Sequence, residues 1–292
     1  MSLASGLVIV DKPAAITSHD VVARVRRLAG TRKVGHAGTL DPMATGVLVL
    51  GVNRATRLLG HLMLTEKGYD ATIRLGVSTT TDDAEGEVVS VTPAAQLDEG
   101  AVRAALEQFV GAIEQVPTAV SAIKVDGKRA YQRVRDGETV ELKPRPVTVH
   151  AIEVHDVAST DSTTDVSISV RCSSGTYIRA IARDLGESLG VGGHLTALRR
   201  TAVGAFDLSR ARTLDELADD FRLLPIAEAA RATFLAFELD ESQAVDVRVG
   251  RRLDLELNTI TAVFAPDGEF LALYEPRAGE PGVARPLAVF TG

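Results

Sequence analysis

The sequence is poor in sulfur and in aromatic side chains. Its 292 residues include one cysteine, three methionines and no tryptophan, and aromatic residues make up only 4%. The single cysteine, Cys172, excludes an internal disulfide bond and any zinc site built from several thiolates. Because a chain without disulfides fits a reducing compartment, we expect a cytoplasmic protein.

The sequence also lacks a long apolar run. Its longest strongly apolar stretch, Gly46–Val52, is far shorter than the ~20 residues that span a bilayer. Residues Met1–Val10 contain no basic side chain, so they do not start like a secretory signal peptide. We therefore expect no association with a membrane.

Several common catalytic motifs are missing. The sequence contains no G-x-x-x-x-G-K-[ST] phosphate loop, no G-x-G-x-x-G fingerprint, no H-E-x-x-H and no G-x-S-x-G elbow. The six histidines are scattered along the chain, which argues against a catalytic metal cage. These absences disfavour the usual nucleotide-dependent, zinc-dependent and serine-hydrolase chemistries.

Charge is unevenly distributed along an acidic chain whose net charge is −7. Basic residues exceed acidic ones in residues 1–60, 121–145 and 171–212, whereas residues 82–116 and 236–292 are acidic. The three basic segments either converge on one face that binds a polyanion or form separate solvated surfaces. Charge alone leaves both interpretations open.

Hydrophobic periodicity predicts an α+β fold with a mostly antiparallel mixed sheet and flanking helices. The expected strands are Leu7–Val10, Gly46–Gly51, Tyr69–Val77, Glu87–Val91, Val147–Val157, Val166–Cys172, His194–Phe206, Thr259–Ala265, Phe270–Tyr274 and Pro286–Phe290. The expected helices are one with Ser18 as N-cap and Gly30 after its end, then Arg54–Leu62, Asp98–Phe109, Thr176–Leu189 and Thr213–Asp220.

Asp41 is the main candidate for chemistry, and we expect it in a catalytic cleft. It lies in Thr31–Pro42, which we expect to be a loop. A carboxylate acts as a covalent nucleophile when a nearby cation keeps it ionised and water is excluded, and Arg179 or Arg183 would supply that cation. An Asp-Pro pair also forms ordinary turns, so the residues alone leave this alternative open.

The stretch around Asp41 resembles a known family. Gly35–Leu48, with the sequence GHAGTLDPMATGVL, is similar to the central motif of the TruB family of pseudouridine synthases. Further blocks that resemble the family are Val10-Asp11-Lys12-Pro13 with Thr17-Ser18, Lys67-Gly68-Tyr69, Leu75–Gly86, Gln115–Lys128, Cys172–Arg179 with Asp184-Leu185-Gly186, and Leu198-Arg199-Arg200. The resemblance covers about residues 6–212.

The resemblance implies an isomerase that acts on uridine 55 in the T-arm loop of tRNA. Such an enzyme flips the base out, cleaves the N-glycosidic bond, turns the uracil and rejoins it through carbon. By resemblance Asp41 is the nucleophile and Arg179 is the active-site cation. Tyr69 stacks on the uracil and helps to remove the C5 proton. No metal and no organic cofactor is implied.

The resemblance also implies residues that bind the substrate. Tyr177 and Leu198 line the uridine pocket, with a place in the core as the alternative for each. His36 fills the space that the flipped base leaves, with a backbone-bonded loop histidine as the alternative. Lys12 supports the site or a phosphate.

The resemblance suggests two domains. Residues 1–235 form the catalytic domain, with residues 117–146 as an insertion that grips RNA, and residues 236–292 form a small β-rich PUA-like domain. In the insertion, phosphate contacts are expected from Lys124, Lys128, Arg129, Arg133 and Arg135. Thr118-Ala119-Val120 differs from the bulkier stretch expected there. We expect tRNA as the partner, a monomer and no obligatory protein partner, with assistance to tRNA folding as a further expected activity.

Two alternatives come from other functional classes. The first is a non-catalytic RNA-binding or tRNA-folding protein, against which the combination of Asp41, Arg179 and Tyr69 argues. The second is a base-excising hydrolase, which pairs Asp41 with a second carboxylate that activates water. Asp83 and Asp184 are the nearest candidates for that carboxylate.

Overall fold

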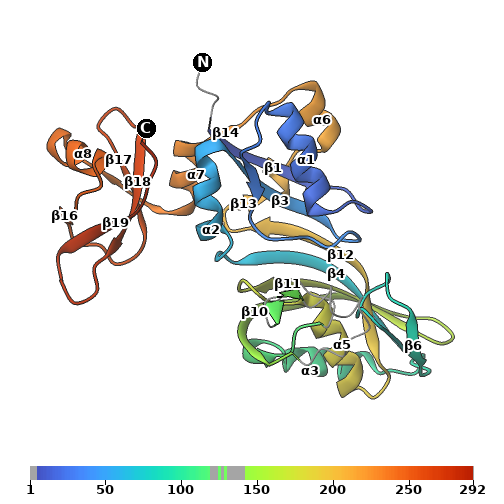
Figure 1. Cartoon of the computed structure of the whole chain (residues 1–292). Helices are drawn as coiled ribbons and strands as arrows, with labels where there is room; N and C mark the ends of the chain where they lie inside the picture. Colours follow the sequence, from blue (N-terminus) through green and yellow to red (C-terminus); the bar gives the residue numbers. More distant parts are fainter. Residues whose placement is uncertain (1–4, 119–123, 126–127, 130–141, 292) are drawn as a thin grey trace.

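The computed structural model describes residues 5–118, 124–125, 128–129 and 142–291 (Figure 1). Most of the strands belong to one large sheet. These are β1 (Gly6–Lys12), β2 (Val34–His36), β3 (Thr45–Val52), β4 (Lys67–Leu75), β7 (Gly111–Gln115), β10 (Arg145–Ser159), β11 (Thr164–Cys172), β12 (Gly193–Val203), β13 (Phe206–Asp207) and β14 (Leu224–Pro225).

The large sheet is mixed and mostly antiparallel. Its strand order is β14-β1-β3-β12-β4-β11-β10-β7, with β2 beside β3 and β13 beside β12. Among the strands of this sheet that the structure describes, only β3 and β12 pair in parallel, and they meet near the middle of the sheet. The predicted α+β class with a mostly antiparallel mixed sheet is therefore confirmed.

Helices flank this sheet (Figure 1). They are α1 (Ser18–Leu28), the 3-10 helix η1 (Asn53–Leu58), α2 (Leu59–Leu62), α3 (Glu99–Glu107), α5 (Ile178–Ser188), the 3-10 helix η2 (Leu208–Arg210), α6 (Leu214–Asp219) and α7 (Ile226–Thr233). The helix α8 (Glu241–Arg248) belongs to the C-terminal part and packs there. No described helix has both the length and the apolar character needed to cross a membrane.

Sequence pattern explains which faces of the sheet are covered. In β3 every residue after Thr45 is buried, because α1 packs on one face and η1 with α7 packs on the other. In β4 buried residues alternate with more exposed ones, as expected for a strand with one solvent face. The buried face of β4 includes Tyr69, Ile73 and Leu75, which share a core cluster with α3 and α5.

The C-terminal part forms a second sheet. Its strands are β15 (Leu235–Glu238), β16 (Leu253–Asp254), β17 (Thr261–Phe264), β18 (Phe270–Pro276) and β19 (Val283–Val289), in the order β15-β17-β18-β19-β16. Phe264, Phe270 and Phe290 join the core cluster that contains residues of β1 and β3. The same cluster contains residues of η1, α2 and α7, and α2 and α7 lie between the small sheet and the large one (Figure 1).

Several expected elements differ in detail. The N-cap of α1 is Thr17, not Ser18, because Thr17 and Asp20 form a reciprocal capping box. Val34–His36, expected within a loop, is strand β2. The expected helix over residues 54–62 is a 3-10 helix followed by one α-helical turn.

The neighbour predicted for the strand at Tyr69 also differs. The strand β6 (Val88–Val91) pairs with the short strand β5 (Val77–Thr79), not with β4. Gly76, which has a φ of +105°, separates β4 from β5 and turns the chain out of the large sheet. The two-stranded β5–β6 hairpin therefore carries the turn with Asp82 and Asp83 at one side of the large sheet.

Candidate active site

The loop that carries Asp41 is held by its backbone. The Ser18 hydroxyl accepts from the Leu40 amide at 2.9 Å and donates to the Leu40 carbonyl at 3.0 Å. The amide of Ala15 donates to the carbonyl of Pro42 at 2.9 Å. Both neighbours of Asp41 in the chain are therefore fixed to the segment that leads into α1.

The side chain of Lys12 also holds the loop that carries Asp41. Its fully buried Nζ donates to the carbonyls of Pro13, Ile16 and Pro42 at 2.9, 2.7 and 3.1 Å. Burial lowers the pKa of Lys12 to about 8, although the charge of Asp41 acts in the opposite direction. With three carbonyl partners, this ammonium is placed to support the loop.

Arg200 holds the loop from the sheet side. Its side chain is 1% exposed, and it donates to the carbonyls of Val47, Gly38 and Thr39 at 2.7, 3.2 and 3.4 Å. At Gly46 a Cβ atom would lie 2.2 Å from the Arg200 carbonyl, so only glycine fits there. The sequence placed Arg200 in a family block without indicating this role.

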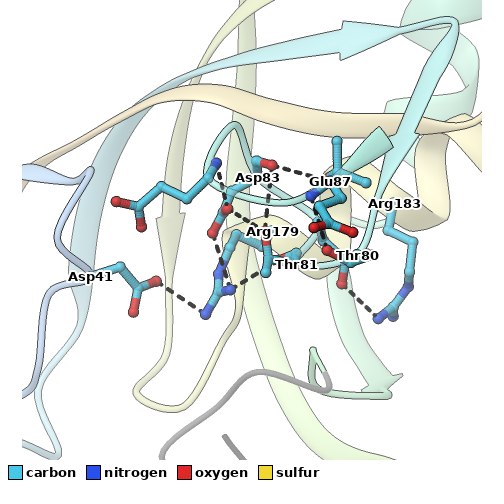
Figure 2. Close-up of polar contacts among 10 residues, drawn as sticks. Asp41, Thr80, Thr81, Asp83, Glu87, Arg179 and Arg183 are labelled. Carbon is cyan, nitrogen blue, oxygen red and sulfur yellow. Dashed lines mark hydrogen bonds and ion pairs between the residues drawn. The ribbon is translucent and has the colours of Figure 1, made fainter. Parts of the chain in front are cut away.

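Asp41 faces the cation expected for it. Its Oδ2 lies 3.1 Å from Nη2 of Arg179, and its side chain is 38% exposed (Figure 2). Arg179 belongs to the first turn of α5, and its own side chain is only 6% exposed. The geometry therefore pairs a carboxylate with a buried guanidinium while solvent or a substrate still reaches it.

Arg179 is itself held by a second carboxylate. Its Nη1 lies 3.1 Å from Asp83 Oδ2 and donates to the Thr81 carbonyl at 2.9 Å (Figure 2). Asp83 also accepts from the Thr81 hydroxyl and from the Glu85 amide. One guanidinium thus joins the β5–β6 turn to the Asp41 loop.

The carboxylates considered for a hydrolase are engaged elsewhere. The side chain of Asp83 is 3% exposed and is surrounded by donors, so it has no room to activate water toward Asp41. Asp184 pairs with Arg183 at 2.8 Å, and Arg183 also reaches Asp82 at 3.3 Å. This geometry argues against the hydrolase and gives Asp83 a supporting role that the sequence analysis missed.

Tyr69 lies on the buried face of β4. It is 8% exposed, and its direct cross-strand partners are Val170 on β11 and Arg200 on β12. Burial raises the pKa of its phenol, while the nearby Arg200 guanidinium acts to lower it. Because so little of the ring is exposed, the stacking expected for Tyr69 requires neighbouring side chains to move.

Leu198 packs in the same core as Tyr69, and Tyr177 lies at the start of α5. Leu198, opposite Ala71, is 9% exposed and belongs to the same core cluster as Tyr69. Tyr177 is half-buried and directly precedes α5. The Gln115 side chain exchanges two hydrogen bonds with the Tyr177 backbone, at 2.8 and 3.1 Å, and so fixes the start of the helix that carries Arg179. Gln115 is a further supporting residue to which the sequence assigned no role.

His36 ends strand β2, before the Asp41 loop. It is half-buried, and its ring lies 5.7 Å from the ring of His19 at an angle of 83°. An edge-to-face pair of this kind orients both rings. His19, on the exposed side of α1, is a neighbour that the sequence analysis did not single out.

The residues expected to grip RNA are only partly described. Lys124 with Val125 forms β8, and Lys128 with Arg129 forms β9; the two strands pair as a small hairpin. Arg133 and Arg135 lie outside the described residues.

A hollow of about 300 Å³ lies on the solvent face of β4, β11 and β12. Of the predicted site residues that the structure describes, only Tyr69 lines it, and Asp41 does not, so the hollow is separate from the carboxylate described above. In the part of the chain that the structure describes, no three His, Cys, Asp or Glu side chains are grouped to hold a metal ion.

Three models of known protein families match successive parts of this chain. The family model "TruB family pseudouridylate synthase (N terminal domain)" matches residues 26–178. The models "tRNA pseudouridylate synthase B C-terminal domain" and "tRNA Pseudouridine synthase II, C terminal" match residues 179–232 and 234–291.

Relatives of similar length are known. A protein of Thermobifida fusca named tRNA pseudouridine synthase B is 59% identical, over 99% of this chain and all of that protein. One of the same name from Arthrobacter sp. is 58% identical, over 98% of this chain and 96% of that protein.

Solved structures share the fold. A chain of the "Crystal Structure of a Cbf5-Nop10-Gar1 Complex" has a TM-score of 0.76 at 25% identity, covering 98% of this chain and 85% of that chain. A chain of the "Structure of H/ACA RNP bound to a substrate RNA containing 2'-deoxyuridine" has a TM-score of 0.75 at 24% identity with the same coverage. Given the family models and these relatives, the chain belongs to the TruB family of pseudouridylate synthases.

Proposed function

We propose that this protein isomerises uridine 55 in the T-arm loop of tRNA to pseudouridine, with Asp41 as the nucleophile. The observation that carries the proposal is the ion pair between the partly exposed Asp41 and the buried Arg179. A carboxylate fixed by a buried guanidinium and still open to a substrate is placed to act as a covalent nucleophile. The sequence relationship to tRNA pseudouridine synthases supports the choice of substrate.

The reaction is an isomerisation and needs no oxidant or reductant. The Asp41 carboxylate forms a transient bond to the flipped nucleotide, at C1′ of the sugar or C6 of the base. The N1–C1′ bond breaks, the uracil turns, and a C5–C1′ bond forms. Arg179 orients the Asp41 carboxylate before the attack and pairs with its charge when it leaves again.

The last step restores the uracil ring. The C5–H bond breaks, its electron pair forms the C5–C6 double bond, and N1 takes a proton from water. We assign the acceptance of the C5 proton to the phenolic oxygen of Tyr69, which also stacks on the base. Tyr177 and Leu198 shape the pocket around the uracil, and His36 occupies the space that the base leaves in the RNA.

The binding of tRNA is assigned to the rest of the chain. Residues 117–146, with Lys124, Lys128, Arg129, Arg133 and Arg135, grip the phosphates of the arm, and residues 236–292 form a separate PUA-like domain. The protein works in the cytoplasm as a monomer without an obligatory protein partner, because one RNA arm is a single asymmetric ligand.

Tritium release tests this function directly. tRNA is transcribed with tritium at C5 of its uridines and incubated with the protein in the presence of a chelator. We expect about one tritium per tRNA to enter water, since the reaction replaces one C5–H bond. Changing the target uridine to cytidine should abolish the release.

Two other outcomes of the tritium experiment can be distinguished from isomerisation. Tritiated free uracil with an abasic site would replace the isomerase by a base-excising hydrolase. Binding of tRNA without release of tritium or uracil would leave a non-catalytic RNA-binding protein. Either result would overturn the proposal.

A further inference from the structure

Arg200 is a buried cation that has no carboxylate partner among the described residues. Its side chain is 1% exposed, yet among the described residues it makes no ion pair, and it donates to the carbonyls of Gly38, Thr39 and Val47. The basic side chains near it are two more cations, Lys12 and Lys67, whose pKa values its charge helps to lower. A buried charge that is not neutralised is unfavourable, so an anion at this position would be stabilised.

Tyr69 is the group best placed to become that anion. It is the direct antiparallel partner of Arg200, and directly opposed residues point to the same face of a sheet. A β-bulge follows Arg200 in this pair, a feature that typically re-aims side chains beside active sites. The phenol is buried with the guanidinium, where charge interactions are stronger than in water.

We propose that Arg200 is a positioning residue of this site: it fixes the backbone that leads to Asp41 and stabilises negative charge on the phenolic oxygen of Tyr69. The inference rests on the proposed function in one respect, namely that Tyr69 accepts the C5 proton. A phenolate accepts a proton far more readily than a phenol does. Arg200 would thereby serve the last step of the reaction without touching the substrate.

The ionisable groups that face Tyr69 come from three elements. Arg200 on β12 favours the phenolate, Asp41 in its loop disfavours it, and Cys172 on β11 also disfavours it when ionised. Burial raises the pKa of Cys172 to about 11, so this thiol is neutral at physiological pH. Arg200 is therefore the group among these three that favours the charged phenol.

The titration of Tyr69 tests this inference independently of RNA. The chain has four tyrosines, so fluorotyrosine labelling yields few ¹⁹F resonances, and Tyr69→Phe assigns one of them. Fluorination also lowers the pKa of a phenol and brings its titration into the range in which the protein is folded. In Arg200→Gln we expect the Tyr69 midpoint to rise by about one pH unit or more, equivalent to a tenfold loss of phenolate.

Arg199→Gln is the matched control. Arg199 is the residue next to Arg200 and carries the same charge. It pairs with Asp11 at 2.7 and 3.0 Å, and its side chain is 38% exposed. We expect this variant to shift the Tyr69 midpoint by less than about 0.3 unit, since an exposed charge is screened. An equally small shift in folded Arg200→Gln would overturn the proposal.

Arg200→Lys covers the case in which Arg200→Gln does not fold. A lysine keeps the charge but loses the guanidinium fork, so the Tyr69 midpoint should stay within about 0.5 unit of the wild type. If the Tyr69 midpoint rises by one pH unit or more in Arg200→Lys, the effect depends on the shape of the side chain and not on its charge. That result would also overturn the proposal.

The rate of tritium release adds a functional measurement. In Arg200→Gln the rate should fall roughly tenfold near neutral pH and recover in part as the pH rises, because more phenolate forms. A loss that is the same at every pH would indicate a structural role alone. If the wild type releases no tritium, the proposed function fails, while the Tyr69 titration still decides on Arg200.

Discussion

The carboxylate of Asp83 lies 3.1 Å from one terminal nitrogen of Arg179, and the other terminal nitrogen of this guanidinium faces Asp41 at the same distance. Asp83 therefore holds Arg179 in the orientation that presents it to the nucleophile. Because Asp83 is buried and Asp41 is partly exposed, the two carboxylates have different roles at one cation.

We predict that Asp83→Asn slows tritium release at least about tenfold while tRNA affinity changes less than threefold, since the change is remote from phosphates and acts on the orientation of Arg179. Single-turnover kinetics and filter binding measure the two effects. Asp70→Asn is the control, because Asp70 is exposed and accepts from Ser169 on the solvent face of the sheet. Equal rate losses in both variants would remove the role assigned to Asp83.

We predict that Asp41→Asn abolishes turnover but preserves the fold and the binding of tRNA. An amide keeps the shape and still accepts a hydrogen bond from Arg179, but it is a poor nucleophile. Because the side chain is 38% exposed, the free energy of unfolding should change by less than about 1 kcal/mol. Measurable residual turnover, after hydrolysis of the amide back to Asp has been excluded, would contradict the nucleophilic role.

We predict that His36→Ala slows the modification of folded tRNA more than that of a short, loosely structured T-arm hairpin. His36 is expected to compensate for the extrusion of the base, which costs less when the base is already loose. His19→Ala is the comparison, since it removes the ring that packs edge-on against His36. Equal losses of His36→Ala on the two RNAs would argue against a role in base flipping.

We predict that tRNA affinity falls steeply with salt although the protein is acidic. Each phosphate contact releases counterions and contributes up to about 0.9 to the log–log slope. Reversing the charges of Arg129, Arg133 and Arg135 together should flatten this slope. A slope equal to that of the wild type would place the RNA-binding face away from residues 117–146.

The pKa of Lys12 predicts a pH dependence of stability. The folded-state pKa is about 8 and the ordinary value is 10.5, so between these pH values the unfolded chain binds a proton that the folded chain has lost. The contribution of Lys12 to the free energy of unfolding should therefore rise with pH across this window.

The measurement compares wild type with Lys12→Met by denaturant unfolding at several pH values. The difference between the two should move in favour of the wild type from pH 8 to 10.5. Lys33→Met, at an exposed position, should show no such trend. A constant difference for Lys12→Met would show that burial does not lower its pKa.

Much of the fold follows from local pattern. The strict alternation at β4 and the unbroken apolar run at β3 distinguish a strand with one solvent face from a strand that is covered on both faces. The C-terminal sheet was predicted only in part. The sequence pattern does not predict helices α7 and α8 or the short strands β15 and β16. Elements of two to eight residues show too little hydrophobic periodicity to be recognised.

The sequence by itself determined the family, the fold class and the candidate nucleophile, because the motif around Asp41 is long and contiguous. Only the tertiary structure decided how Asp41 is held. Five residues from separate elements hold Asp41 in place, either through backbone carbonyls or through Arg179. They are Ser18, Lys12, Asp83, Gln115 and Arg200. Every residue has a backbone carbonyl, so the sequence does not indicate which carbonyls accept these hydrogen bonds. The partners of the ion pairs lie far apart in the chain. Which of them meet depends on the register of β3, β4 and β12, which no single segment of sequence specifies.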